Sequence, residues 1–328
     1  MRGGELRSWP DDFVNKVIHG DCLDVMREMP DKSVNCCVTS PPYWGLRNYG
    51  VDGQLGLEKT PEEYVEKMVV IFREVKRILR GDGTLWLNLG DSYSQGSAWS
   101  DSDDKRLRDR FKGQTAEHKP GRGNDLATHR AVSLLPKNLV GIPWRVAFAL
   151  QADGWYLRSD IIWSKPNPMP ESVTDRPTRA HEYIFLLSKS RKYYYDAEAI
   201  REKGESGEYD LTMRKEGRMD GTRYLASGTR QMVAGMSLGV GREYRNKRSI
   251  WTIATRCYSE AHFATFPEKL IEPCILAGCP ESGIVIDPFI GSGTTAKVAQ
   301  EMKRDFIGIE LNGKYIPLIE NRTAQGVL

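Results

Sequence analysis

The sequence predicts an α/β protein built on a doubly wound, mostly parallel sheet, and two stretches carry this prediction. In residues 284–295, a run of β-branched residues ends in Asp287, and a proline, two glycines and a helix-like segment follow. This order is typical of a strand, a tight loop and a helix start, where ligands bind at the carboxyl ends of parallel strands. Residues 17–21 repeat the pattern, since a short apolar strand ends in Asp21 before a helix-like run.

The elements between these stretches alternate in the same way. Thr60 opens a capping box with Pro61 at the first helical position, and apolar residues at helical spacing follow until Gly81. We expect Pro317 to shorten or kink the helix that should follow Asn312. The other expected elements are strands at 34–39, 84–89, 155–163, 182–188 and 306–309, and helices at 144–151, 268–277 and 296–302.

Two segments lack this periodicity. Residues 92–133 are polar and mixed in charge, so they are expected to be an inserted loop. Residues 201–248 are rich in glycine, and between residues 211 and 250 nine Lys or Arg residues stand against three Asp or Glu residues. A charge excess of this kind is compatible with a polyanionic partner, although a solvated surface is the more usual explanation.

Composition narrows the class of protein. The 328 residues, 40% of them apolar, suit one large α/β domain or two smaller ones, and the net charge of +3 requires no particular partner. No apolar run is long enough to span a membrane, and residues 1–10 lack a signal core, so we expect a cytoplasmic protein. The six cysteines form no Cys-x-x-Cys pair, which favours structural thiols over disulfides, and we expect no metal.

The glycine loop alone leaves its ligand open. A phosphate-binding Walker loop would need lysine where Thr294 stands. Gly291, Gly293 and Ala296 fit a dinucleotide fingerprint, with Glu310 near the position of an acid that binds ribose hydroxyls. A tight turn without any ligand fits too. A third cofactor, S-adenosyl-L-methionine, would require a second motif elsewhere in the chain.

That second motif is at residues 40–43, which read Ser-Pro-Pro-Tyr at the end of an expected strand. Together with residues 287–295, Asp-Pro-Phe-Ile-Gly-Ser-Gly-Thr-Thr, it resembles the circularly permuted, β-type amino-directed DNA methyltransferases, which include the cytosine-N4 enzymes. The resemblance implies a seven-stranded, mostly parallel sheet of the S-adenosylmethionine-dependent methyltransferase type with inserted variable loops. It covers roughly residues 17–89, 138–196 and 248–321, including segments 160–165, 181–183 and 262–267.

The resemblance implies roles for individual residues. The Ser40 hydroxyl and the carbonyl of Pro41, fixed by Pro42, would accept hydrogen bonds from an exocyclic amine, and Tyr43 would stack on a base flipped out of the duplex. Trp44 is a further candidate for the base, or a core residue. The expected cofactor residues are Asp21 for the adenine amine, Glu310 for the ribose hydroxyls, Phe266 and Pro267 for the pocket wall, and Asp287, Pro288, Phe289, Gly291, Ser292, Gly293 and Thr294 for the methionine part. For the two strand-end carboxylates, Asp21 and Glu310, helix capping is the alternative role.

The expected substrate is double-stranded DNA. Ser before Pro-Pro is the usual cytosine form and Asp the usual adenine form, so we expect cytosine N4, with adenine N6 as the alternative because Ser also occurs among adenine enzymes. An NAD-dependent oxidoreductase is a more distant alternative that leaves residues 40–43 unexplained. A non-catalytic DNA-binding protein is another, against which the intact catalytic motif argues.

The resemblance also divides the chain. We expect a catalytic domain at residues 14–325, interrupted by the insert at 92–133 and by a target-recognition segment at 197–248. The basic residues expected at DNA are Arg223, Arg230, Arg242, Arg245, Lys247 and Arg248. The sequence leaves the oligomeric state open, monomer or homodimer. It also leaves open whether the enzyme acts in a restriction-modification system with a cognate endonuclease or in solitary modification.

Overall fold

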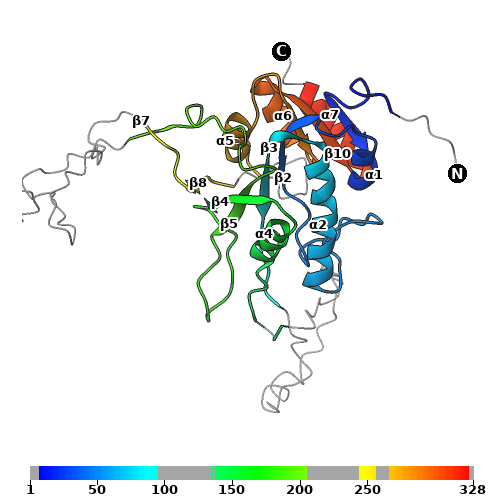
Figure 1. Cartoon of the computed structure of the whole chain (residues 1–328). Coiled ribbons are helices and arrows are strands. Elements are labelled where there is room, and N and C mark those ends of the chain that lie inside the picture. The colour runs from blue at the N-terminus through cyan, green and yellow to red at the C-terminus, as the bar shows by residue number, and fades with distance from the viewer. Residues whose placement is uncertain (1–6, 95–133, 136, 205–243, 256–265, 325–328) are drawn as a thin grey trace, which may run out of the picture. The chain divides into compact units, whose positions relative to one another are not determined.

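The computed structural model describes residues 7–94, 134–135, 137–204, 244–255 and 266–324. Contacts within the chain divide it into two units, Met1–Asp196 with Ser249–Leu328, and Ala197–Arg248. The first unit holds one sheet, in the strand order β1-β10-β9-β2-β3-β5-β4-β8 (Figure 1). Residues 262–265 of the expected segment 262–267 lie outside the described residues.

The sheet is mostly parallel, as predicted, because only β5 runs against its neighbours. Within the described residues it has eight strands, whereas the resemblance implies seven. The additional strand consists of three residues that pair with the end of β4, with Ile250 opposite Ile162. The strands are β1 (Lys16–His19), β2 (Val34–Thr39), β3 (Leu79–Leu89), β4 (Tyr156–Ser164), β5 (His181–Ser188), β8 (Ile250–Thr252), β9 (Ile284–Asp287) and β10 (Asp305–Glu310).

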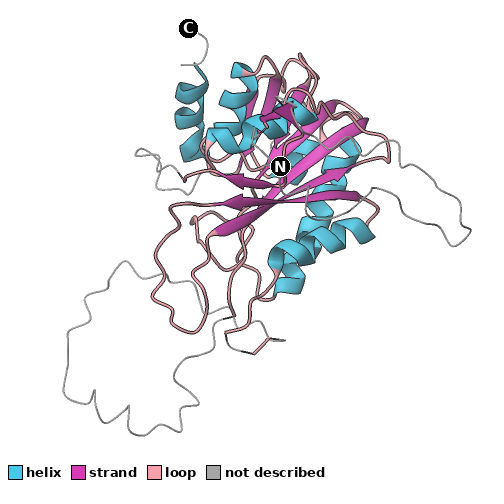
Figure 2. Ribbon diagram, turned by 90° about the vertical axis from the view of Figure 1, so that its left-hand side faces the viewer, coloured by secondary structure: helices cyan, strands magenta, loops and turns pink. Residues whose placement is uncertain are grey.

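Helices cover both faces of the sheet (Figure 2). α2 contacts both α1 and α4, whereas α6 contacts both α5 and α7, so the helices form two groups. The helices are α1 (Cys22–Arg27), α2 (Pro61–Ile78), α4 (Ile142–Ala152), α5 (Glu268–Gly278), α6 (Thr294–Glu301), the short 3-10 helix η2 (Gly313–Tyr315) and α7 (Ile316–Ala324). None of the helices in the described residues has the length and apolarity needed to cross a bilayer.

The longest helix, α2, forms as its sequence predicts. Thr60 Oγ1 accepts a hydrogen bond from the Glu63 backbone N–H at 3.1 Å and so caps the first turn. The apolar side chains at helical spacing are buried against the sheet, among them Met68 and Phe72, both fully inaccessible. The helix ends before Gly81, because the chain turns directly into β3 at Leu79.

The circular permutation is visible at the edge of the sheet. β1 pairs in parallel with β10, from Lys16 opposite Ile307 to His19 opposite Glu310. Asn15 fixes this pairing, because its Oδ1 accepts a hydrogen bond from the Phe306 backbone N–H at 3.1 Å. A strand from the start of the sequence therefore completes the sheet beyond its last strand.

Pro317 does not interrupt the last helix. It is the second residue of α7, in the first turn, where a helix needs no N–H from it. The residues before it form η2, which begins after Asn312. The proline therefore lies at the start of the α-helix. Of the two expected effects, shortening the helix or kinking it, the structure shows the first.

In the second unit, two short strands pair in antiparallel fashion, β6 (Glu202–Lys203) and β7 (Tyr244–Arg245). This pairing places Lys203 opposite Tyr244, so the described residues on either side of 205–243 lie side by side. Glu202 accepts hydrogen bonds from Arg245 Nε at 2.8 Å and Arg248 Nε at 2.7 Å. Arg223, Arg230 and Arg242 lie outside the described residues, as do residues 95–133 of the insert at 92–133.

Candidate active site

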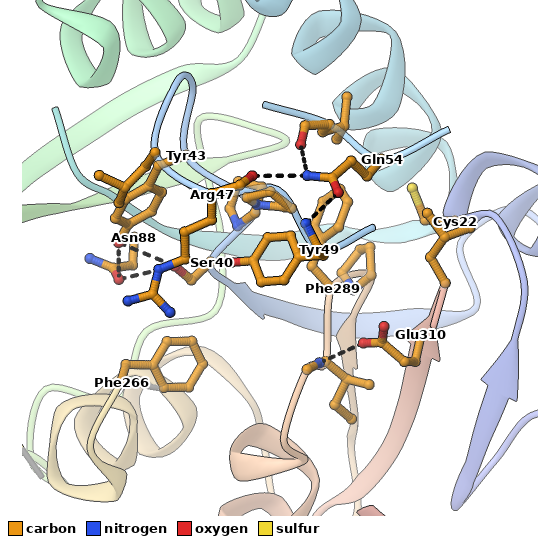
Figure 3. Close-up of a pocket in the computed structure, with 18 of the residues that line it drawn as sticks. Cys22, Ser40, Tyr43, Arg47, Tyr49, Gln54, Asn88, Phe266, Phe289 and Glu310 are labelled. Carbon is orange, nitrogen blue, oxygen red and sulfur yellow. Dashed lines mark hydrogen bonds between the residues drawn. The ribbon is translucent and has the colours of Figure 1, made fainter. Parts of the chain in front are cut away.

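One edge of the sheet carries the expected site residues. The parallel strands β1, β10, β9, β2, β3 and β4 all end there, and the reversed strand β5 begins there. A cavity of about 1190 Å³ opens along this edge. That volume exceeds the roughly 300–1,000 Å³ usual for one small ligand, so the cavity has room for two. Figure 3 shows Glu310 and Cys22 at one side of it and Ser40, Tyr43 and Asn88 at the other.

The Ser-Pro-Pro-Tyr segment forms one wall of the cavity, and all four of its residues line it. Tyr64 Oη donates to the Pro42 carbonyl at 2.9 Å, whereas no described residue donates to the carbonyl of Pro41. Trp44 is buried and its Nε1 donates to a backbone carbonyl, so this residue belongs to the core. The segment therefore offers a fixed carbonyl oxygen beside the Ser40 hydroxyl.

A hydrogen-bond network surrounds Ser40 Oγ. Asn88 Oδ1 lies 3.2 Å from Ser40 Oγ and 3.0 Å from Tyr43 Oη. Tyr43 Oη also lies 2.7 Å from Glu182 Oε2, a carboxylate oxygen that can only accept. The Asn88 amide nitrogen donates to Glu182 Oε2 at 3.3 Å and to the Tyr183 carbonyl at 3.0 Å, which fixes the orientation of the amide.

An ion pair closes this network on its far side. Lys165 Nζ binds Glu182 Oε1, and the ammonium lies 4.3 Å from the ring centroid of Trp163. All three residues line the cavity. Burial, followed by the charge of Glu182, raises the pKa of Tyr43 well above its usual range, so its phenol keeps its proton.

Asp287 lies beneath the glycine loop. Its side chain is 1% exposed and is absent from the residues that line the cavity. Oδ1 accepts hydrogen bonds from Thr39 Oγ1 at 2.6 Å and from the Phe289 N–H at 3.0 Å, and Oδ2 accepts one from Thr295 Oγ1 at 2.6 Å. Burial raises the pKa of Asp287 to about 6, against these hydrogen bonds, which lower it. The carboxylate thus holds the loop from below and joins it to the end of β2.

Two strand-end carboxylates line the other side of the cavity. Glu310 accepts hydrogen bonds from the Gly291 N–H at 3.0 Å and the Asn312 N–H at 2.8 Å, and it is 9% exposed. Burial raises the pKa of Glu310 to about 7, and the charge of Asp287 adds to this, while the two N–H bonds lower it. Asp21 caps α1 through the Leu23 N–H at 2.8 Å, so capping and cavity lining coincide in this residue.

The remaining predicted cofactor residues divide into two groups. Pro267 and Gly293 do not line the cavity. Gly293 instead packs on α7, with φ +81° and room for no side chain, since a Cβ there would lie 2.6 Å from Ile319 Cγ2. The lining residues are Pro288, Phe289, Gly291, Ser292, Thr294 and Phe266. The ring of Phe266 points into the cavity (Figure 3).

The lining residues that the sequence did not assign to the site include Asn88, Lys165, Glu182 and Arg47, although Lys165 and Glu182 lie in the segments 160–165 and 181–183 of the resemblance. Asn88, Lys165 and Glu182 are polar residues at or next to strand ends, and this position is the signal by which the sequence could have identified them. Arg47 extends into the cavity from the loop after Tyr43 (Figure 3). No described residue accepts a hydrogen bond from its guanidinium group.

The two halves of the cavity suit two different ligands. A buried carboxylate between loop N–H groups, with the apolar ring of Phe289 near it in the cavity (Figure 3), fits a nucleoside with free ribose hydroxyls. The opposite half presents acceptors for an amine. An enzyme that passes a small group from a nucleoside cofactor to an amine needs this arrangement, and on this fold such enzymes are S-adenosylmethionine-dependent methyltransferases.

Comparison with known proteins specifies the family. Residues 34–321 match the family model described as DNA methylase, and the chain belongs to this family. It is 45% identical to the Type II methyltransferase M.Cfr9I of Citrobacter freundii over 93% of this chain and 86% of that protein. It is likewise 45% identical to M.SmaI of Serratia marcescens, over 94% and 90% of the two chains. The protein is therefore a site-specific DNA methyltransferase that uses S-adenosyl-L-methionine.

Solved structures agree on the fold. The cytosine-N4-specific PvuII DNA methyltransferase aligns with a TM-score of 0.59 and 20% identity, over 95% of this chain and 86% of that one. A Thermus thermophilus protein described as a putative DNA modification methylase, complexed with S-adenosyl-L-methionine, aligns with a TM-score of 0.55 and 22% identity, over 95% of each chain. The predicted fold class is confirmed, and the oxidoreductase alternative is excluded by family membership.

The raised pKa of Glu310 leads to a prediction about cofactor affinity. The carboxyl must lose its proton before it accepts hydrogen bonds from two ribose hydroxyls. Affinity for the product S-adenosylhomocysteine should therefore rise as the pH increases through about 7, by up to about tenfold per pH unit below that value. Glu310→Gln should bind more weakly and lose this part of the rise. Calorimetric titration of both proteins across this range measures it, and identical pH profiles would show that another group is responsible.

Proposed function

We propose that the enzyme methylates N4 of cytosine in double-stranded DNA, and that Ser40 orients the amine. The observation that carries the proposal is the hydrogen bond from Ser40 Oγ to Asn88 Oδ1 at 3.2 Å. A hydroxyl has one proton and two lone pairs. Ser40 Oγ has two acceptors for its one proton, Asn88 Oδ1 and, at 3.3 Å, Tyr43 Oη. With the proton committed to either, Ser40 has lone pairs left to accept a hydrogen bond from an N–H group in the cavity.

The direction of each hydrogen bond follows from Glu182. Its carboxylate accepts from Tyr43 Oη, so the one phenolic proton is committed there. The Asn88 nitrogen donates to Tyr183 and Glu182, so Asn88 Oδ1 faces Ser40 and Tyr43 as an acceptor. Since Tyr43 has no second proton, Asn88 Oδ1 is left to Ser40. In this way Glu182 sets the orientation of the Ser40 hydroxyl through two intermediate side chains.

The chemistry accounts for two acceptors side by side. The lone pair of an exocyclic amine is delocalised into the base, so the amine is a poor nucleophile. Hydrogen bonds from its two N–H groups to Ser40 Oγ and the Pro41 carbonyl favour the pyramidal, attacking form, and fixed acceptors need no reorganisation. Bound S-adenosylmethionine supplies an electrophilic methyl group on its sulfonium. Ser40 is a weak base, so it orients the amine and the surplus proton leaves to solvent.

The cofactor is assigned to the opposite half of the cavity. We infer that Glu310 accepts the ribose hydroxyls, that Phe289 and Phe266 cover the adenine, and that Asp21 lies at the adenine amine. The loop residues Gly291, Ser292 and Thr294 would meet the methionine part. Asp287 is proposed to support this loop from beneath, because its oxygens are occupied by Thr39, Thr295 and the Phe289 N–H.

The choice of base rests on Ser40. Asp is usual at this position in adenine enzymes, and serine is usual in cytosine enzymes. DNA from a host that expresses the enzyme should therefore contain N4-methylcytosine, detected by mass spectrometry of its nucleosides, and sequencing should place it at one recognition sequence. Host DNA without the gene is the control. N6-methyladenine at that sequence would assign adenine as the target instead, and no modified base in host or purified substrate DNA would reject methylation of DNA.

Changes in the network should affect the rate of methyl transfer and leave cofactor binding intact. Ser40→Ala removes an acceptor and should lower the single-turnover rate by about 10²–10³-fold. In Glu182→Gln the new amide can donate to Tyr43 Oη, which then turns its own proton towards Asn88 and competes with Ser40, so the rate should fall as well. Ser33→Ala, in a surface turn, is the matched control. Rates within a few-fold of wild type in both variants would contradict the assigned roles.

We propose that the segment 197–248 reads the DNA sequence and that the β6–β7 pair lies at its base. The support is the excess of nine basic over three acidic residues between 211 and 250. Arg245 and Arg248 bind Glu202, so within this base they stabilise the pairing and are available to phosphates only at their exposed atoms. Lys247 and the arginines at 223, 230 and 242 are assigned to the DNA on charge alone.

Replacing residues 205–243 with a short Gly/Ser linker should separate recognition from catalysis. Affinity for S-adenosylhomocysteine should stay near wild type, because no cofactor residue lies in this segment. Specific DNA binding should fall towards the non-specific level, a gap that is commonly about 4–10 kcal/mol. Fluorescence anisotropy with specific and scrambled duplexes measures the specific and the non-specific affinity for DNA. Methylation of the unchanged recognition sequence by the linker variant would assign recognition to the insert at 92–133.

The relatives at 45% identity are Type II methyltransferases, which supports a place in a restriction-modification system with a cognate endonuclease. We propose a cytoplasmic enzyme that acts as a monomer or homodimer. The five described cysteines are all free and buried, which suits a reducing compartment.

A further inference from the structure

The loop between β4 and β5 presents an apolar side chain at the cavity. Met169 lines the cavity and is 85% exposed, the highest value among the large apolar side chains of the described residues. Leu46 and Val70 also line the cavity and are 46% and 43% exposed. Single exposed apolar side chains are common on protein surfaces, but these three line the same cavity, where a ligand can cover them.

The backbone around Met169 has little freedom. Prolines stand at positions 166, 168 and 170, and each fixes its own φ. A residue before proline is also restricted to extended conformations, and both Asn167 and Met169 stand before one. The loop therefore presents Met169 on a stiff segment, and little further backbone entropy is lost when the side chain enters a binding partner.

The stiff segment is also anchored at its base. The Lys165 N–H donates to the Ala180 carbonyl at 2.8 Å, which continues the pairing of β4 with β5. Asn167 Oδ1 accepts a hydrogen bond from the Thr255 N–H at 2.9 Å, and its Nδ2 donates to the Thr255 carbonyl at 3.3 Å. The loop thus stands at a fixed place, four residues after the lysine that binds Glu182.

We propose that Met169 enters the DNA duplex at the position that the target base leaves. This inference rests on the proposed reaction at Ser40, which requires the base to leave the stack in order to enter the cavity. Extrusion leaves a gap between the neighbouring base pairs, and apolar side chains, methionine included, insert between base steps in other DNA-binding proteins. An exposed methionine on a stiff, anchored segment beside the cavity has the chemistry and the position for this.

Removing the side chain should slow methylation only where the base must be extruded from a paired duplex. The substrates are one duplex with the sequence that the enzyme modifies in host DNA and a second duplex with an abasic site opposite the target base. Met169→Ala should lower the single-turnover rate on the paired duplex by about tenfold or more relative to wild type. On the abasic duplex, where extrusion costs less, the two enzymes should differ by no more than about twofold.

Three controls define the outcome. Met169→Leu, which keeps an apolar side chain of similar size, should restore most of the rate on the paired duplex. Leu135→Ala removes another exposed apolar side chain, 77% exposed and away from the cavity lining, and should match wild type on both duplexes. Affinity for S-adenosylhomocysteine should be the same in all variants.

Two results would overturn the proposal. An unchanged rate of Met169→Ala on the paired duplex would mean that nothing is inserted there. An equal loss on both duplexes would place Met169 at the bound base or cofactor instead of in the duplex. Since wild-type methylation of the same duplexes is the reference, either result is distinguishable from failure of the proposed reaction.

Discussion

The buried carboxylate of Asp287 joins the two halves of the site. Its oxygens accept from Thr39 at the end of β2 and from Thr295 at the start of α6, both at 2.6 Å. Ser40 is the next residue after Thr39, and the glycine loop lies between Asp287 and Thr295. This side chain, together with the parallel pairing of β2 and β9, therefore holds the distance between the amine acceptors and the cofactor loop. Its raised pKa reflects the burial that this position demands.

The same edge of the sheet brings two further carboxylates into the cavity with different surroundings. Glu182 is paired with Lys165, and it is bound by hydrogen bonds from Tyr43 and Asn88. Glu310 has no such cation among its hydrogen-bond partners, only two backbone N–H groups, and its pKa rises to about 7. The Lys165 ammonium therefore compensates the carboxylate on the amine side of the cavity. The half that suits the cofactor retains a carboxyl that titrates near neutral pH.

Sequence patterns were sufficient for the fold class and for the glycine loop and Ser-Pro-Pro-Tyr segments, because each is a local signal. The partners of Ser40 could not be read in this way. Asn88 meets Ser40 because β3 lies parallel beside β2, and Glu182 reaches Asn88 and Tyr43 because β5 runs antiparallel beside β3. A strand pattern states neither its neighbours nor its direction. The sequence also placed Asp287 towards the cofactor, since it cannot tell which face of a strand end is buried. The eighth strand, β8, was not predicted because its three residues are too few to show the alternation of a strand.

The position of β1 beside β10 has a consequence for the newly made chain. Asp21 and Glu310 line one cavity, yet nearly the whole catalytic unit is synthesised between them. At roughly 5–20 residues per second, the first half of the cofactor pocket waits on the order of tens of seconds for its second half. The cofactor can contribute binding energy to folding only after β10 has left the ribosome, so the early strands must remain unaggregated without help from their ligand.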